Sequence, residues 1–297
     1  MNNETENKPI FIRGMSRSGG TLLVTVLDVH PWISMSYELY PTLFDDHLDS
    51  NILHQIAEKL MKKNFKKDKF AQTVPAFTKF TSRAERGGID NVTLGTLLFE
   101  FLVSHGSITT TEDRLQFIAE CCKYKMRRDK KQYWGLKCSN RYQDYLAVWP
   151  QAIFLNIIRD GRDVLASQLN TGSFSHTPKE LGISWSNTHQ KFRELMKQVP
   201  NQAFEIKYED LVRTPEVELL ILMHKMALPF DEALLNHADR DLTLFKSHHL
   251  SMEQVKKPIN DNKIGRWKKD LSEADLQEFL REAKDTLIEF GYEVQGC

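Results

Sequence analysis

Residues 10–21 read IFIRGMSRSGGT, a short apolar run followed by a glycine-rich turn. The next residues, up to position 29, carry leucine and valine at helical spacing, so the segment predicts a strand, a glycine loop and a helix. The loop has the frame of a phosphate-binding loop, G-x-x-x-x-G-K-[ST], with Gly20 in place of the lysine. Glycines and a helix N-terminus still favour anion binding there, and Arg17 can supply the positive charge. The alternative is a glycine-rich turn that only joins strand to helix.

Two further apolar runs, at residues 133–137 and 152–158, predict buried strands, and the alternating residues 203–207 predict another. Helical stretches separate these runs, which is typical of a parallel sheet covered on both faces. We therefore expect the α/β class, with a P-loop-type open parallel sheet flanked by helices. We expect a single domain over residues 1–297, with a mainly helical insertion or lid at 39–131, after the first strand–helix unit and on the acceptor side.

The clearest helix is predicted near the C-terminus, at residues 272–290. Leucine, phenylalanine, alanine and isoleucine recur there at helical spacing and form one apolar stripe. Ser272 is the expected N-cap, and Gly291 lies just past the expected end.

The charge balance excludes several classes of protein. The 297 residues include 40 Lys+Arg and 40 Asp+Glu, so the formal net charge is zero, which argues against a general nucleic-acid or membrane-surface binder. No apolar run approaches the roughly 18 residues of a membrane span. The polar, acidic start MNNETENKP is unlike a secretory signal, and the four cysteines show no Cys-x-x-Cys spacing. These features predict a cytoplasmic protein without a membrane anchor, a disulfide framework or a structural zinc site.

A second candidate anion site follows the strand predicted at 152–158. The sequence RDGRDVLAS places Arg159 at the strand end and Ser167 two helical turns further on. Open parallel sheets bind ligands at this edge, and arginine offers paired planar donors to a phosphate. The alternative is a helix start capped by Asp163, with Arg159 in a surface ion pair. Two anion sites without a Mg²⁺-ligand pattern predict one ligand with two separated phosphate groups, and the missing loop lysine disfavours nucleoside triphosphate hydrolysis.

These motifs resemble those of the sulfotransferases that use 3′-phosphoadenosine 5′-phosphosulfate (PAPS). RSGGTLL is similar to the 5′-phosphosulfate loop of that family, and RDGRDVLAS to its 3′-phosphate motif. The chain most resembles the protein-tyrosine sulfotransferase branch. LDVHPWISMSYEL is similar to the segment that leads to the catalytic glutamate, here Glu38, and WGLKCSN to the segment with an active-site lysine, here Lys137. KYEDLV, SMEQVKKPIN and GRW are similar to donor-binding segments, and the motifs run in order from residue 10 to 267.

The resemblance implies roles for individual residues. Glu38 is the expected general base, and Arg17, Lys137 and Ser251 are expected to stabilise the charge that develops during transfer. The residues expected to hold the donor are Arg17, Ser18, Gly19, Gly20, Thr21, Arg159, Ser167, Tyr208, Ser251, Gln254, Val255, Lys256, Lys257, Asn260 and Arg266. No metal ligand is expected, because arginine, lysine and loop amides cover the anionic oxygens.

The sequence also departs from the branch. The arginines that follow the catalytic glutamate there are absent from residues 39–44, and Thr171 stands where a basic donor contact is expected. The branch is a membrane-anchored, disulfide-bearing Golgi type, and this chain shows no anchor. The acceptor therefore stays open between a peptide or protein tyrosine, a small phenol or alcohol, and a sugar; a homodimer stays open too, and no nucleic-acid partner is expected.

The expected function is transfer of the sulfuryl group from PAPS to an acceptor hydroxyl by metal-free in-line displacement, with PAP as product. The alternatives are a small-molecule or carbohydrate sulfotransferase with the same donor site, a P-loop kinase or NTPase, and a non-catalytic nucleotide-binding module.

His30 and the pair His248-His249 are rival bases, although His30 beside Pro31 fits better as a turn residue that accepts a backbone hydrogen bond. Trp267 is a candidate for packing over the donor. The basic run at 123–131 is interpreted as a solvated helix face or as the rim of an acceptor cleft.

Overall fold

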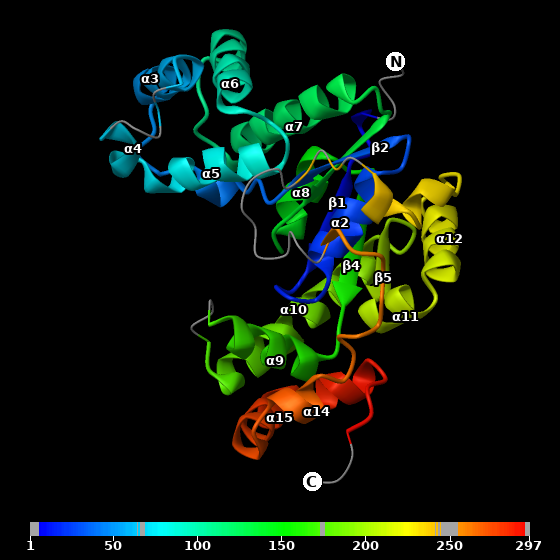
Figure 1. Cartoon of the computed structure of the whole chain (residues 1–297). Helices are drawn as coiled ribbons and strands as arrows, with labels where there is room; N and C mark the ends of the chain where they lie inside the picture. The colour runs from blue at the N-terminus through cyan, green and yellow to red at the C-terminus, as the bar shows by residue number, and fades with distance from the viewer. Residues whose placement is uncertain are drawn as a thin grey trace. The chain divides into compact units, whose positions relative to one another are not determined.

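The computed structural model describes residues 6–63, 65, 69–172, 176–240, 242, 244 and 255–294. Five short strands form its sheet: β1 (Ile10–Gly14), β2 (Ile33–Tyr37), β3 (Tyr133–Lys137), β4 (Ile153–Ile158) and β5 (Ala203–Lys207). The strand order is β2-β3-β1-β4-β5, and the pairs β1–β3, β2–β3 and β4–β5 are parallel. Helices flank the strands (Figure 1), so the predicted α/β class is confirmed.

Most boundaries agree with the sequence patterns. The strands predicted at 133–137 and 203–207 have those bounds, and the first helix, α2, covers Gly20–Asp28. Strand β2 was not predicted, because its two serines hide the apolar pattern. All five of its residues are nevertheless buried, and the hydroxyl of Ser34 lies within hydrogen-bond distance of Lys125 and Asp129. Tertiary contacts therefore satisfy a polar group that the sequence alone marks as unfavourable inside a sheet.

The chain divides into two compact units, and the first comprises Met1–Ile12, Val24–Ile153 and Asp231–Pro258. Its helices beyond β2 confirm the mainly helical character predicted for 39–131, and Figure 1 shows the first four of them grouped beside α7. They are α3 (Ser50–Met61), α4 (Phe70–Thr73), α5 (Pro75–Arg86), α6 (Asn91–His105) and α7 (Thr111–Arg128), followed by α8 (Tyr142–Val148). Phenylalanine rings pack at their centre, where Phe44 contacts Phe77, Phe80 and Phe117 with ring centroids 5.2–6.0 Å apart.

A buried ion network in the first unit corrects the interpretation of the basic run at 123–131. Lys125 of α7 is fully buried, and its Nζ lies 2.8 Å from Asp28 Oδ1 and 2.9 Å from Asp129 Oδ2. The same Asp28 oxygen accepts a hydrogen bond of 2.7 Å from the backbone N–H of Met35 in β2. Lys125 is therefore not part of a solvated helix face. Because its ammonium group is paired with Asp28 and Asp129, and Asp28 also binds β2, the network joins α7 to this strand at the edge of the sheet.

The second unit comprises Arg13–Leu23, Phe154–Phe230 and Ile259–Cys297. In its C-terminal helix the Ser272 hydroxyl caps the first turn by accepting from Asp275 N, and Gly291 has a φ of +76° just past the end, as predicted. The apolar stripe of this helix packs on its neighbours through Phe279 and Leu287. The helices are α9 (Gly161–Thr171), α10 (Pro178–Gln198), α11 (Tyr208–Arg213), α12 (Pro215–Lys225), α14 (Trp267–Asp270) and α15 (Glu273–Glu289).

A buried histidine makes the stability of the second unit sensitive to acid. His189 of α10 is fully buried against Trp185 and Phe290, and its Nδ1 lies 3.1 Å from Asn156 Nδ2. Burial lowers the pKa of His189 to about 3, with smaller contributions from neighbouring arginines. The folded side chain is therefore neutral where the unfolded one already binds a proton. Stability should fall by about 1.4 kcal/mol per pH unit as the pH drops below about 6.5.

We expect the His189→Gln variant to remove this contribution, because glutamine does not titrate. Between pH 6.5 and 5 the wild-type protein should lose about 2 kcal/mol more unfolding free energy than H189Q in urea titrations. The matched control is His47→Gln at an exposed position, which should keep the wild-type pH dependence. An equal decrease of unfolding free energy with pH in H189Q and the wild type would contradict the assignment of the acid sensitivity to His189.

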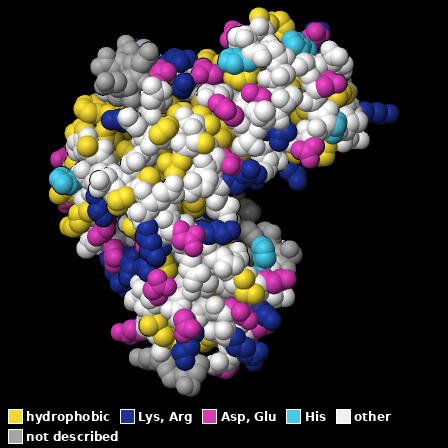
Figure 2. Space-filling view, turned by 180° about the vertical axis from the view of Figure 1, so that it is seen from behind, with side chains coloured by type: hydrophobic (Ala, Val, Ile, Leu, Met, Phe, Trp, Pro, Cys, Tyr) yellow, Lys and Arg dark blue, Asp and Glu magenta, His cyan; other side chains and the backbone are white. Residues whose placement is uncertain are grey.

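Charged side chains of both signs are interspersed on the face shown in Figure 2, in keeping with the zero net charge. In the part of the chain that the structure describes, each helix is too short or too polar to cross a membrane.

Candidate functional site

The glycine loop between β1 and α2 turns sharply. Arg17 and Gly19 have φ angles of +76° and +94°, in the left-handed region, and Ser18 N donates to Met15 O at 3.0 Å. Gly14 lies so close to β4 that a Cβ there would be 2.5 Å from Ile157 Cγ2. The nine-residue helix α2 begins directly after this turn. The loop therefore has the compact form and the helix N-terminus that anion binding needs.

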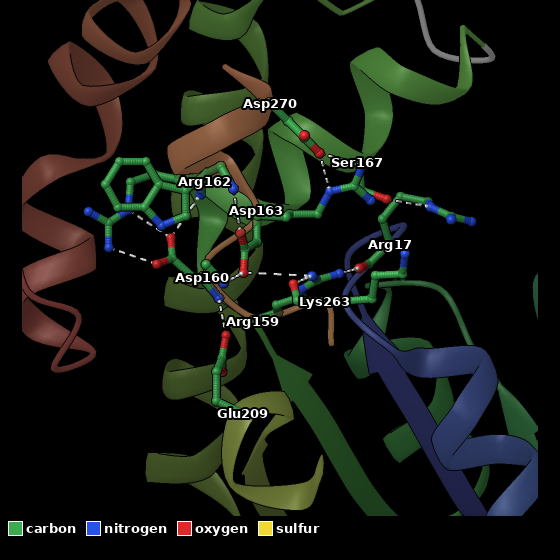
Figure 3. Close-up of polar contacts among 12 residues, drawn as sticks. Arg17, Arg159, Asp160, Arg162, Asp163, Ser167, Glu209, Lys263 and Asp270 are labelled. Atoms are coloured by element: carbon green, nitrogen blue, oxygen red, sulfur yellow. Dashed lines mark hydrogen bonds and ion pairs between the residues drawn. The ribbon is translucent and has the colours of Figure 1, made fainter. Parts of the chain in front are cut away.

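Arg159, at the end of β4, lies against this loop (Figure 3). One guanidinium nitrogen donates to the Arg17 carbonyl oxygen at 3.0 Å, and the other donates to the Lys263 carbonyl oxygen. The guanidinium also lies over the ring of Tyr208, 4.6 Å from its centroid. Arg159 is only 4% exposed, so the interpretation of a surface ion pair was wrong.

Ser167 completes this group from α9. Its buried hydroxyl accepts a hydrogen bond of 3.0 Å from Arg17 Nε. The two candidate anion motifs are thus in direct contact through their side chains, as Figure 3 shows. Ser18 Oγ and Arg159 Nε are buried without a hydrogen-bond partner among the described residues, and such groups are costly unless a ligand or water satisfies them.

A C-terminal loop is tied to the same arginine through Asp163. The fully buried Asp163 carboxylate accepts from the backbone N–H groups of Gly265, at 2.8 Å, and Trp267, at 3.0 Å. It also lies 3.6 Å from Arg159 NH2. The helix N-cap is Asp160, which accepts from Arg162 N, so the alternative of Asp163 as N-cap is wrong. Distant backbone contacts, which leave no local pattern, decide the role of Asp163.

The remaining predicted donor residues are placed as follows. Asn260 is half-buried and accepts from Asn262 N, whereas Arg266 pairs with Asp270 at 2.7 Å. Trp267 packs under Arg162, 4.2 Å from its ring centroid. In the first unit Val255 is buried and Lys256 and Lys257 are exposed, while Ser251 and Gln254 lie outside the described residues. Gly20 and Thr21 form the first turn of α2.

We expect the Gly19→Ala variant to destabilise the loop strongly. The φ of +94° disfavours a side chain, and an added Cβ would lie 2.5 Å from Tyr208 Cδ2. The two effects together should lower the unfolding free energy by about 3 kcal/mol. Gly172→Ala is the control, because Gly172 has a φ of +58° but open space within 4 Å, and it should lose about 1 kcal/mol. Equal losses in urea titrations would show that contact with Tyr208 contributes nothing.

A second group of predicted residues lies in the first unit. Tyr37 of β2 and Lys137 of β3 are register partners, so Glu38, one residue past β2, lies beside Lys137. Lys137 Nζ donates to Glu38 Oε1 at 2.7 Å and to the Tyr37 hydroxyl at 3.4 Å. Glu38 has a φ of +54°, which is uncommon for a residue other than glycine. The predicted base and the predicted lysine are thus in direct contact.

The charges of this pair stabilise each other. Burial would raise the pKa of Glu38, but the charge and hydrogen bond of Lys137, with the charge of Arg83, outweigh it and lower that pKa. Burial would lower the pKa of Lys137, but Tyr37 and Glu38 raise it above its usual value. At neutral pH the carboxylate is therefore ionised and can accept a proton, and the lysine is a cation. Among the described residues no cluster of His, Cys, Asp and Glu is arranged to hold a metal ion.

Arg83 of α5 is a residue that sequence reasoning missed. It donates to the Glu38 carbonyl oxygen at 3.0 Å, and its NH1 lies 3.7 Å from Glu38 Oε2. Its position 45 residues after Glu38 carries no local signal, although the absence of arginine in 39–44 indicates that a cation could come from elsewhere. Of the rival bases, His30 accepts from Trp32 N at 3.1 Å, which confirms its prediction as a turn residue. His248 and His249 lie outside the described residues.

Comparison with known proteins gives the class of this chain. The model of the sulfotransferase family matches residues 9–232, more than half of the sequence, and the chain therefore belongs to that family. Protein-tyrosine sulfotransferase 1 of Danio rerio is 23% identical over 300 residues, which cover 96% of this chain and 72% of that protein. Protein-tyrosine sulfotransferase A of Caenorhabditis elegans is 23% identical over 267 residues, 87% of this chain and 60% of that protein. The protein-tyrosine sulfotransferase of Drosophila melanogaster is 24% identical over 87% of this chain, and the aligned region covers only 46% of the Drosophila protein.

Solved structures support the fold. The sulfotransferase domain from the Synechococcus PCC 7002 olefin synthase aligns with a TM-score of 0.60 and 19% identity, over 97% of this chain and 95% of that one. The sulfotransferase domain from the curacin biosynthetic pathway aligns with a TM-score of 0.60 and 16% identity, over 97% and 98%. At these identities the similarity shows the fold alone.

Proposed function

We propose that this chain transfers the sulfuryl group of PAPS to an acceptor hydroxyl. The observation that carries the proposal is the contact of Arg159 with the Arg17 carbonyl in the loop at 14–20. A ligand with two separated phosphate groups fits two adjacent groups of anion donors better than a nucleoside triphosphate does. The loop also lacks the lysine that nucleoside triphosphate chemistry needs.

The residues present fit such a donor. The N-terminus of α2 and the loop, with the buried Ser18 hydroxyl, are suited to the 5′ side, and Arg159 and Ser167 to the 3′-phosphate. PAPS supplies an activated sulfuryl group and a leaving phosphate. The unpartnered Arg159 Nε and Ser18 Oγ are the buried polar atoms that an anion would satisfy.

In the proposed reaction, one bond forms between the acceptor oxygen and sulfur while the bond from sulfur to the phosphate oxygen breaks. The acceptor proton passes to the Glu38 carboxylate, and PAP leaves. Arg17 and Lys137 stabilise the charge that develops on the oxygens, each by about 3 kcal/mol if positioned as fixed donors. Ser251, which lies outside the described residues, has the same role by resemblance.

The lowered pKa of Glu38 bears on the timing of proton transfer. A phenol has a pKa of about 10 and an ordinary glutamate about 4.3, so the carboxylate is a weak base toward the free acceptor. Proton transfer therefore occurs late, when bond formation to sulfur has made the acceptor proton acidic. The ion pair keeps the carboxylate deprotonated and ready at neutral pH.

For the acceptor we propose the tyrosine of a peptide or protein, because the relatives over most of the chain are named protein-tyrosine sulfotransferases. The missing arginines at 39–44 favour a second candidate, a small phenol, alcohol or sugar. An acceptor screen with labelled PAPS separates the two: transfer to tyrosine peptides and not to simple phenols or sugars is the expected result.

The donor is tested by thermal unfolding in the presence of PAP or of ATP with Mg²⁺. Ligand that binds the native state raises the unfolding midpoint by mass action. A stabilisation by PAP that ATP does not match is expected. Stabilisation by ATP alone, with Mg²⁺-dependent turnover, would replace the proposal with a kinase or NTPase, and binding of PAP without transfer to any acceptor would indicate a non-catalytic module.

A further inference from the structure

Glu38 has an unfavourable backbone conformation that neighbouring groups must stabilise. Its φ of +54° lies in the left-handed region, where a side chain with a Cβ is disfavoured by roughly 1 kcal/mol or more. The residue directly follows β2, so this φ turns the chain out of the strand direction at the carboxylate. A conformation of this kind persists only where the surrounding contacts determine it.

Arg83 makes those contacts at both ends of the residue. Its NH1 donates to the Glu38 carbonyl oxygen at 3.0 Å and lies 3.7 Å from the carboxylate oxygen Oε2. The guanidinium also lies over the ring of Tyr40, 4.8 Å from the centroid. The Arg83 side chain is 25% exposed, so most of its surface is withdrawn from solvent. Both oxygens are contacted by NH1 while the planar guanidinium lies over the Tyr40 ring, an arrangement that the compact ammonium group of a lysine does not reproduce.

Lys137 cannot replace Arg83 in this respect. Its Nζ contacts the other carboxylate oxygen, Oε1, at 2.7 Å, and its remaining contact here is the Tyr37 hydroxyl. The two cations thus divide the carboxylate between them, and only Arg83 also holds the backbone of Glu38 in these contacts. Without Arg83, the left-handed turn loses a partner and the carboxylate is free to rotate toward Lys137.

We propose that Arg83 is a positioning residue that fixes the carboxylate of Glu38 for proton acceptance by binding its backbone and its side chain together. The inference rests on the proposed function, in which Glu38 is the base. Arg83 acts through Glu38 and is assigned no contact with donor or acceptor. Among the described residues, Lys137, Tyr37 and Arg83 act on the Glu38 carboxylate, and of these three only Arg83 comes from the helical insertion.

The experiment compares Arg83→Gln with Arg86→Gln, one turn further along α5. No hydrogen bond or ion pair joins Arg86 to Glu38 among the described residues, so R86Q is the matched control. The first measurement is a ¹³C-carboxyl NMR titration of glutamate side chains, with Glu38 assigned by its absence in E38Q. The second is kcat and KM for PAPS, and circular dichroism confirms that each variant is folded.

R83Q should raise the pKa of Glu38, because a positive neighbour is removed, whereas R86Q should leave it unchanged. The kcat of R83Q should fall about 10- to 100-fold, as expected when a reacting group is misplaced, with KM for PAPS within about twofold. R83K should keep the Glu38 titration near the wild-type position because the charge remains. Its kcat should still fall, because lysine has no planar guanidinium to lie over the Tyr40 ring and hold the donor nitrogen at both oxygens.

Two results would overturn the inference: a Glu38 titration that is the same in R83Q and the wild type, or an R83Q kcat equal to that of R86Q. If R83Q does not fold, R83K supplies the same comparison of kcat. A wild-type protein that binds PAP but transfers no sulfuryl group would refute the proposed function instead. In that case the titration still decides whether Arg83 holds Glu38, so the two failures are distinguishable.

Discussion

Replacing Arg159 with methionine is expected to abolish measurable PAP binding, with an affinity loss of at least about 100-fold. The guanidinium is buried and makes two hydrogen bonds to the Arg17 and Lys263 carbonyl oxygens, so it is held in place before any ligand arrives. A charge-assisted hydrogen bond to phosphate contributes about 1.5–3 kcal/mol, and a bidentate one contributes more. Two such bonds correspond to at least about two powers of ten in affinity. Isothermal titration with PAP measures the loss.

Arg162 provides a closely matched control. It lies three residues further on, is 5% exposed against 4% for Arg159, and is equally charged. Its bonds go to the Asp160 carboxylate, at 2.9 and 2.7 Å, and it packs on Trp267, so its role is structural. R162M should therefore lower stability but keep PAP affinity within about threefold. Similar PAP affinities in R159M and R162M would refute the assignment of Arg159 to the donor.

The folding of R159M needs its own check, because methionine leaves the buried Asp163 carboxylate without its cation. An uncompensated buried charge is strongly destabilising, by about 3–5 kcal/mol. The double variant R159M/D163N removes that charge, and its asparagine oxygen can still accept from Gly265 or Trp267 N. If the double variant folds and still fails to bind PAP, lost stability is excluded as the cause.

Replacing Glu38 with glutamine is expected to reduce kcat by about 10³-fold, within the range for removal of a general base. Glutamine keeps the shape of the side chain and an oxygen that accepts from Lys137, but it does not take a proton at neutral pH. PAP affinity should be unchanged, because the hydrogen bonds that hold Arg159 in place go to the Arg17 and Lys263 carbonyl oxygens and not to Glu38. The control is Glu58→Gln on α3, a side chain that is 60% exposed and pairs only on the surface with Lys62. Turnover in E38Q equal to that in E58Q would remove Glu38 from the mechanism.

The same variant tests the stability contribution of the ion pair. Because the folded pKa of Glu38 is lowered, its contribution is present above the unfolded value of about 4.5 and is lost as the pH falls through the folded pKa. The difference in unfolding free energy between wild type and E38Q should therefore be constant from pH 8 to 5 and shrink below about pH 4.5. A difference that grows in acid would show that the pKa is raised and not lowered.

The sequence was sufficient for those parts of the fold that depend on local patterns. Continuous apolar runs predicted β3 and β4, and the serine and glycine at the ends of α15 marked its limits. The loop at 14–20 was predicted from glycine spacing alone. Strand β2 was missed because its two serines interrupt the apolar pattern, although Lys125 and Asp129, about ninety positions away, satisfy the Ser34 hydroxyl. The polar serines of β2 therefore disfavoured a strand in the sequence pattern, whereas the tertiary structure accommodates them there.

The candidate site likewise contains residues that the sequence could identify and residues that only the tertiary structure reveals. Arg159 and Ser167 could be named in advance because they lie in a short motif at a predicted strand end, where open parallel sheets bind their ligands, and Glu38 and Lys137 because their segments resemble those of sulfotransferases. Arg83 and Asp163 could not, because each acts on a group far along the chain through a side chain of common type. An arginine on a charged helix or an aspartate in a helix's first turn has a local explanation, and nothing local contradicts it.

The amino-acid sequence by itself determined four of the five strands, the glycine loop and the residue types at two strand ends, because these follow from periodicity and backbone freedom within a few neighbouring residues. Only the tertiary structure decided which charges meet: Arg159 with the loop carbonyl, Lys125 with Asp28 and Asp129, and Arg83 with Glu38. The physical reason is the short range of these contacts. A hydrogen bond needs its atoms within about 3.5 Å, and this distance is set by the packing of elements that are remote in the sequence.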